Sequence, residues 1–129
     1  MSPRRFAVDM TLAPPPDSTL RRQIGASYVY TLREPGSKRV RYVGVTRVPR
    51  TRWSTHLADA WLREQRGNHV PRTAWIAGLL AADSAPVLDV VEVVKGSAVR
   101  AHEREVVWIH RLGRTEALLN ERNTGRASR

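Results

Sequence analysis

The stretch YVYTLREPGSKRVRYVGVTRVPRTRWSTH, residues 28–56, decides the fold of this chain. Apolar and polar residues alternate in its first part and again in its middle, and this period of two predicts two β-strands. Between them, Pro35, Gly36 and Ser37 favour a turn. The last third has apolar residues at helical spacing, so we expect a helix that opens near Thr51.

The two strands form a predicted hairpin. If its turn is centred on Gly36, Tyr30 pairs with Tyr42 on the neighbouring strand. Gly44 then faces Tyr28 and leaves room for a close approach to the backbone. Taken alone, the facing tyrosines are explained by a cross-strand aromatic pair, which stabilises a hairpin by about 0.5–1 kcal/mol.

The helix after the hairpin is expected to span residues 51–66 and to end at Gly67. On it Arg52 and His56 are four residues apart and share a face. They lie beside an apolar stripe made of Trp53, Leu57, Ala60 and Trp61. Asp59 is explained by a surface ion pair with Arg63, one turn further along. Three more elements are expected: a helix over 71–83, a strand over 87–94 that is buried for much of its length, and a last helix over about 97–113.

These elements predict an α/β (α+β) domain with a small, mainly antiparallel sheet of about three strands, flanked by about three helices.

The last helix carries an acid beside its apolar side. Helical spacing groups Glu105 with Ala101 and Trp108, whereas Glu103 falls on the charged side. Carboxylates are rarely buried unless they are paired or bind a metal. Glu105 is therefore either half of a buried ion pair with a core arginine or a metal ligand.

Composition narrows the class of partner. The chain has 129 residues, enough for one modest core, and 22 Lys and Arg against 12 Asp and Glu give a net charge of +10. This balance favours an anionic partner such as nucleic acid or a membrane surface. No apolar run is long enough to span a bilayer, and no secretory signal is visible. Because the chain has no cysteine, disulfides and thiolate metal sites are excluded, and a cytoplasmic location is expected.

Basic residues concentrate in three regions. Residues 1–26 form an expected N-terminal arm and residues 122–129 a basic tail, each either a loose end or a contact to phosphates. Between 33 and 52, seven basic residues accompany one acid, Glu34. A solvated surface explains most of this run, and a nucleic-acid footprint is the alternative, with Arg47 and Arg50 as candidate substrate-binding residues.

Six short motifs and single residues follow one another along the chain: Tyr28-Val29-Tyr30, Tyr42-Val43-Gly44, Arg52, His56, Glu105 and Leu118-Leu119-Asn120. Their order and spacing resemble the signature of the GIY-YIG nuclease family, over roughly residues 27–121. One departure is clear, because Tyr28 stands where the family has its first glycine. That glycine has a structural role in the family rather than a chemical one.

The resemblance implies one concave site on a small sheet, with one divalent metal ion on the glutamate and a tyrosine as general base. The catalytic residues it implies are Tyr30, Tyr42, Arg52, His56, Glu105 and Asn120. Glu105 would hold the ion, Mg²⁺ or Mn²⁺, and Gly44 would serve close packing. Asn120 would either brace the backbone or orient the phosphate. His69 is a candidate accessory residue, because the homing-endonuclease branch has a second histidine in a comparable loop; an ordinary loop histidine is the alternative.

The residue types suit phosphodiester hydrolysis, which needs a water nucleophile, charge stabilisation and help for the leaving oxygen. Phenols can hold or deprotonate the water, Arg52 offers a planar cationic fork, and His56 can relay a proton or hydrogen-bond a tyrosine. We therefore expect a metal-dependent endonuclease acting on nucleic acid, with DNA favoured, no membrane partner, and a protein partner as a possible source of target specificity. A catalytically silent nucleic-acid-binding module and a basic protein–protein adaptor are the alternatives.

Overall fold

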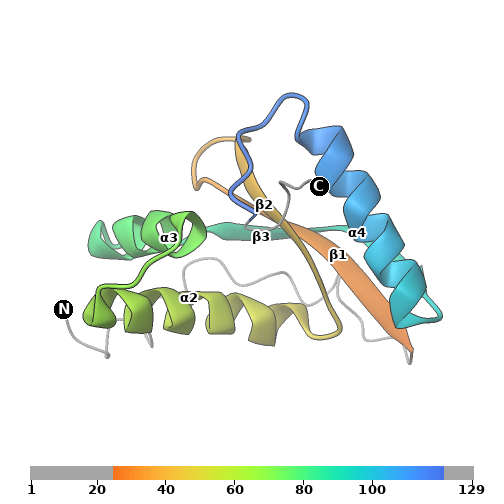
Figure 1. Ribbon diagram of the computed structural model, residues 1–129, viewed down its shortest axis with the longest axis horizontal. Helices are drawn as coiled ribbons and strands as arrows, with labels where there is room; N and C mark the ends of the chain where they lie inside the picture. Colours follow the sequence, from red (N-terminus) through yellow and green to blue (C-terminus); the bar gives the residue numbers. More distant parts are fainter. Residues whose placement is uncertain (1–24, 121–129) are drawn as a thin grey trace.

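The structure, a computed structural model, describes residues 25–120. Within this range the elements are β1 (Ala26–Arg33), β2 (Val40–Thr46), α2 (Pro49–Arg66), α3 (Pro71–Ala81), β3 (Val87–Lys95) and α4 (Ala98–Leu112), as Figure 1 shows. This antiparallel three-stranded sheet with its three helices confirms the predicted fold class. Of the predicted arm only Gly25 and Ala26 are described, and Ala26 already belongs to β1. The predicted tail, residues 122–129, lies outside the described residues.

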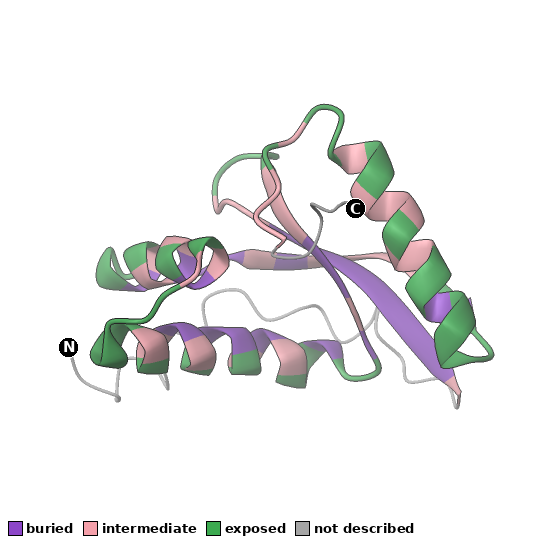
Figure 2. Cartoon of the chain, in the orientation of Figure 1, coloured by how far each residue is buried: buried purple, intermediate pink, exposed green. Residues whose placement is uncertain are grey.

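β1 is the central strand of the sheet, whose order is β2-β1-β3 with antiparallel pairing throughout. On one face Tyr30 packs in a cluster with Trp53 of α2 and Ile76 of α3. On the other face Val29 packs in a second cluster with Ala101 of α4. Helices therefore cover both faces, and β1 is buried along nearly its whole length, as Figure 2 shows.

The register of the hairpin differs from the prediction. Tyr30 lies opposite Gly44 and Leu32 opposite Tyr42, so the expected pairing of Tyr30 with Tyr42 is wrong, as is that of Gly44 with Tyr28. Two features cause the shift. The Glu34 amide donates to the Arg39 carbonyl oxygen at 3.0 Å, which centres the turn between Gly36 and Ser37 rather than on Gly36. An irregularity after Leu32 then moves the register by one more residue.

The helices begin and end close to the expected residues. α2 opens at Pro49, two residues before the expected Thr51, because a proline is well suited to the first turn, where its missing N–H is not needed. It ends at Gly67, whose φ of 70° places the backbone in the left-handed region that glycine favours. Trp53 anchors α2 to the sheet by donating its indole N–H to the Pro86 carbonyl oxygen at 2.9 Å.

β3 is less buried than its β-branched sequence predicts. Leu88 and Val94 are buried, but most of the strand is half-buried and Val93 is 40% exposed. The reason is its position at one edge of the sheet, paired only with β1. Among residues 25–120, none of the helices has the length and apolar character that crossing a lipid bilayer requires.

Candidate active site

The phenol of Tyr30 lies across β2, and the absence of a side chain at Gly44 makes this possible. The two residues are directly opposite each other. A Cβ added to Gly44 would lie 2.5 Å from the Tyr30 hydroxyl oxygen and 2.6 Å from its Cζ. The space above Gly44 is thus filled by Tyr30 itself. Because β2 is an edge strand, the hydroxyl reaches the border of the sheet.

Three aromatic rings meet at this border. Nε2 of His56, on α2, lies 2.7 Å from the Tyr30 hydroxyl oxygen. The His56 ring also stands edge-on to the Tyr42 ring, with centroids 5.2 Å apart, and the two tyrosine rings are 6.2 Å apart. Tyr30 and His56 are buried, whereas Tyr42 is half-buried. Tyr42 is therefore the member of this group with the greatest access to solvent.

Arg52 belongs to the same group of side chains. It lies one turn before His56 on α2 and is half-buried. Its guanidinium lies within hydrogen-bonding reach of the Tyr30 side chain, and its positive charge lowers the pKa of both Tyr30 and His56. The four-residue spacing on one helix thus delivers a cation and an imidazole to one phenol.

Glu105 comes from α4, on the opposite face of the sheet from α2. Its negative charge nevertheless raises the pKa of the Tyr30 phenol, so the two groups are near enough to interact electrostatically. The Glu105 side chain is 18% exposed, and its Oε1 lies 3.2 Å from Nδ1 of the exposed His102, one turn earlier. Charges from helices on opposite faces of the sheet therefore both influence the pKa of Tyr30, and Glu105 has the smallest effect of the groups involved.

Burial controls the ionisation of the two innermost groups. Desolvation, with smaller effects of Tyr42 and Glu105, raises the pKa of Tyr30 well above its ordinary value of 10.0. Desolvation also lowers the pKa of His56 to about 3, assisted by the positive charges of Arg72 and Arg52. At neutral pH this part of the site holds a phenol and a neutral imidazole.

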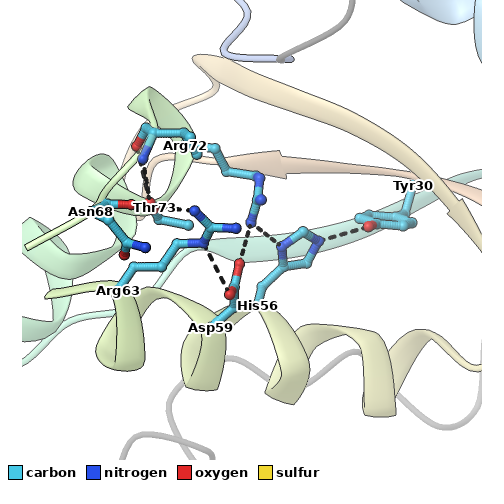
Figure 3. Close-up of polar contacts among 8 residues, drawn as sticks. Tyr30, His56, Asp59, Arg63, Asn68, Arg72 and Thr73 are labelled. Atoms are coloured by element: carbon cyan, nitrogen blue, oxygen red, sulfur yellow. Dashed lines mark hydrogen bonds and ion pairs between the residues drawn. The ribbon is translucent and has the colours of Figure 1, made fainter. Parts of the chain in front are cut away.

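Sequence reasoning missed Arg72, at the start of α3. Its Nη1 lies 3.3 Å from Nδ1 of His56 and 3.5 Å from Oδ2 of Asp59, as Figure 3 shows. Its guanidinium also lies over the Tyr42 ring, 5.7 Å from the centroid. Asp59 does contact Arg63 at 3.2 Å, as expected, but it also holds Arg72. The available signal was the short loop between Gly67 and Pro71, which folds α3 back onto α2.

Asn120 pairs with the backbone of β2 through both ends of its amide. Its Oδ1 accepts from the Val43 N–H at 3.1 Å, and its Nδ2 donates to the Val43 carbonyl oxygen at 2.8 Å. The neighbouring Leu119 N–H donates to the Arg41 carbonyl oxygen at 2.6 Å. The segment after α4 therefore lies along the outer edge of β2, next to Gly44.

The candidate substrate-binding residues lie near the two ends of α2. Arg47 and Arg50, between β2 and the first turn of α2, are exposed. His69, in the loop before α3, has its Nε2 3.5 Å from Oε1 of Glu64. Within the basic run, Arg33 and Arg41 form ion pairs, Arg33 with Asp89 at 2.7 Å and Arg41 with Glu34 at 3.8 Å. These two pairs agree with a structural role for part of that run.

The donor set suits one weakly held ion. In the part of the chain that the structure describes, no group of three or more His, Asp or Glu side chains is placed to hold a metal. Glu105, half-buried with His102 beside it, offers a single carboxylate near Tyr30. This fits Mg²⁺, which keeps several waters and is often held by one or two carboxylates and the substrate phosphates.

Comparison with protein-family models matches residues 26–117 to the GIY-YIG catalytic domain. The matched range contains Tyr30, Tyr42, Arg52, His56 and Glu105 and ends before Asn120. Comparisons with curated proteins and with solved structures found no significant match. Because the family match spans more than half of the chain and agrees with the motif order and the fold, the chain belongs to the GIY-YIG family of nuclease domains.

Proposed function

We propose that this chain is a metal-dependent endonuclease that hydrolyses phosphodiester bonds in nucleic acid, with DNA as the preferred substrate. One relation carries the proposal: the rings of Tyr30, Tyr42 and His56 meet at one border of the sheet, and Arg52 lies one turn before His56 on α2. A phosphodiester needs a cation for its oxygens and a group that orients the attacking water. This arrangement offers both near one phenol.

In this proposal the side chains have separate roles. Arg52 binds the phosphate and stabilises the charge that develops on its oxygens. Tyr42, which is half-buried, orients the attacking water, and Tyr30 completes the site with its hydroxyl group. Asn120 keeps the edge of β2 in place through Val43. When bound at Glu105, one Mg²⁺ or Mn²⁺ ion would supply further positive charge to the phosphate.

Substrate binding depends on the basic surface in this proposal. Arg47 and Arg50 contact backbone phosphates, and His69 adds a contact when it leaves Glu64. Binding should then weaken steeply with salt, and replacing one phosphate-binding arginine with glutamine should reduce the salt slope by about one. Arg47→Lys and Arg50→Lys are the matched controls because they keep the charge. Equal slopes for the glutamine variants and the unmodified protein would remove these arginines from the interface.

The cleavage test uses the full chain, supercoiled plasmid and Mg²⁺. We expect nicking by the unmodified protein, a loss of at least about a hundredfold in Glu105→Gln, and little change in Glu103→Gln. Glu103 is a suitable control because it is exposed on the same helix. Binding without nicking in all three proteins would instead favour the catalytically silent module. A structured RNA in a parallel reaction tests the preference for DNA.

A further inference from the structure

The ring of His56 has a different neighbour at each nitrogen. Nε2 faces the Tyr30 hydroxyl oxygen at 2.7 Å, and Nδ1 faces Nη1 of Arg72 at 3.3 Å. A hydroxyl group can either donate or accept, so Tyr30 alone does not decide which nitrogen carries hydrogen. A guanidinium can only donate. The Arg72 contact therefore requires that Nδ1 accept and carry no hydrogen.

We propose that Arg72 is a positioning residue for the cleavage reaction, because its donation to Nδ1 holds His56 in the tautomer that donates from Nε2–H to the Tyr30 oxygen. This inference rests on the proposed nuclease function. It assigns to Arg72 a role that acts through His56 rather than on the substrate.

The tautomer decides what His56 can do for Tyr30. With hydrogen already on Nε2, the imidazole has no lone pair there to take the phenol proton. The Tyr30 oxygen accepts from His56, so its own O–H is turned away from the imidazole and stays available to another group. If Tyr30 gives up its proton to such a group, the Nε2–H bond stabilises the phenolate. His56 is then a fixed donor and not a proton acceptor.

The surroundings hold Arg72 in place for this role. Its side chain is only 12% exposed. Asp59, which is half-buried and also contacts Arg63 at 3.2 Å, lies 3.5 Å from the Arg72 guanidinium, as Figure 3 shows. The half-buried Tyr42 ring lies on another side, 5.7 Å from the guanidinium carbon. These contacts come from α2 and β2, so Arg72 links both to the imidazole.

Burial and nearby charge support the same protonation state. They lower the pKa of His56 to about 3, so the doubly protonated ring is not populated at neutral pH. A neutral ring carries one hydrogen, and Arg72 excludes Nδ1 as its site. Nε2 remains.

The test is NMR of the histidine ring nitrogens in protein labelled with ¹⁵N-histidine, without substrate, with His56 assigned by comparison with His56→Gln. In the unmodified protein we expect the long-range ¹H–¹⁵N pattern of hydrogen on Nε2 and none on Nδ1. Arg72→Met should move the ring to a mixture of the two tautomers. Arg72→Lys, which still only donates, should keep much of the original pattern.

Arg66→Met is the matched control, because this arginine is exposed at the end of α2. It should leave the ring pattern and the cleavage rate unchanged. We expect the turnover of Arg72→Met to fall by about tenfold or more, with partial recovery in Arg72→Lys. Hydrogen on Nδ1 in the unmodified protein, or the same pattern with and without Arg72, would overturn the inference. The NMR spectra do not depend on catalysis and decide the tautomer by themselves. An unmodified protein that cleaves no nucleic acid would contradict the proposed function and not the tautomer.

Discussion

The phenol of Tyr30 rests on the backbone of Gly44, at a point where a methyl group on Gly44 would lie 2.5 Å from the Tyr30 oxygen. Its hydroxyl is also held at 2.7 Å from His56, so the ring cannot move away without losing that contact. Gly44, in the Tyr42-Val43-Gly44 motif, has no side chain, and Tyr30, in the Tyr28-Val29-Tyr30 motif, occupies the space that a side chain there would fill.

Gly44→Ala should accordingly destabilise the fold and the site together. Overpacking of this kind costs about 1–3 kcal/mol, and we expect a loss of that size in the free energy of unfolding, measured with urea, and a large loss of nicking activity. Gly78→Ala is the matched control, because a Cβ on Gly78 meets nothing within 4 Å. That variant should be as stable as the unmodified protein or gain up to about 1 kcal/mol. Equal stability of Gly44→Ala and the unmodified protein would show that Tyr30 does not rest on Gly44.

Arg52→Ala should reduce turnover much more than affinity. Its guanidinium interacts with the Tyr30 side chain. In the proposed function it acts there on the reacting phosphate, while the exposed Arg47 and Arg50 supply most of the binding. We expect kcat to fall by about 10²–10³ and the Kd for DNA to change by less than about tenfold. Single-turnover cleavage and a filter-binding titration measure the two quantities. Unchanged turnover would remove Arg52 from the site.

Stability should depend on pH through His56. Its pKa falls from 6.5 to about 3 on folding, so the unfolded state binds more protons between these values. The stability is therefore fully present above pH 6.5 and is lost as the pH falls toward 3, by up to about 1.4 kcal/mol per pH unit. Urea unfolding of the unmodified protein and of His56→Gln at pH 7 and pH 5 measures how much of the change in the free energy of unfolding is due to His56. An equal change in both proteins would contradict a neutral, buried His56.

Asn120→Ala should release the outer edge of β2. The amide makes two hydrogen bonds to the Val43 backbone, and losing them should cost about 1–2 kcal/mol in the free energy of unfolding. Amide hydrogen exchange at Val43 should also become faster. The exposed Asn68 provides a control, since Asn68→Ala should leave Val43 unchanged. If the Val43 amide exchanges at the same rate without Asn120, this residue does not brace the strand.

Sequence patterns predicted the elements well, because they depend on local signals. Period-two alternation located both strands of the hairpin, and Gly67 and Pro71 marked the end of one helix and the start of the next. The register failed because it depends on the geometry of the turn and on the irregularity after Leu32, and neither is visible as a residue pattern. Prediction was therefore reliable within elements and weaker between them.

The candidate site shows the same division. Tyr30, Arg52 and His56 were predicted as site residues because each belongs to a short motif, and the structure brings their side chains together. Arg72 is separated from His56 by 16 residues, and on its own helix it resembles an ordinary surface cation. Only the packing of α3 against α2 places it at the imidazole, and the short loop between Gly67 and Pro71 indicates that packing without singling out Arg72.

The most direct test of the account asks whether Glu105 and Tyr30 border one metal-binding site. Mn²⁺ is paramagnetic and broadens NMR signals of nearby nuclei, so it can be titrated into the full chain at low concentration while the ring signals of Tyr30 and His56 are followed. We predict that both rings broaden first, that Glu105→Gln abolishes this effect, and that Glu103→Gln preserves it. Broadening that spares the Tyr30 ring, or that is the same in Glu105→Gln, would contradict a shared site.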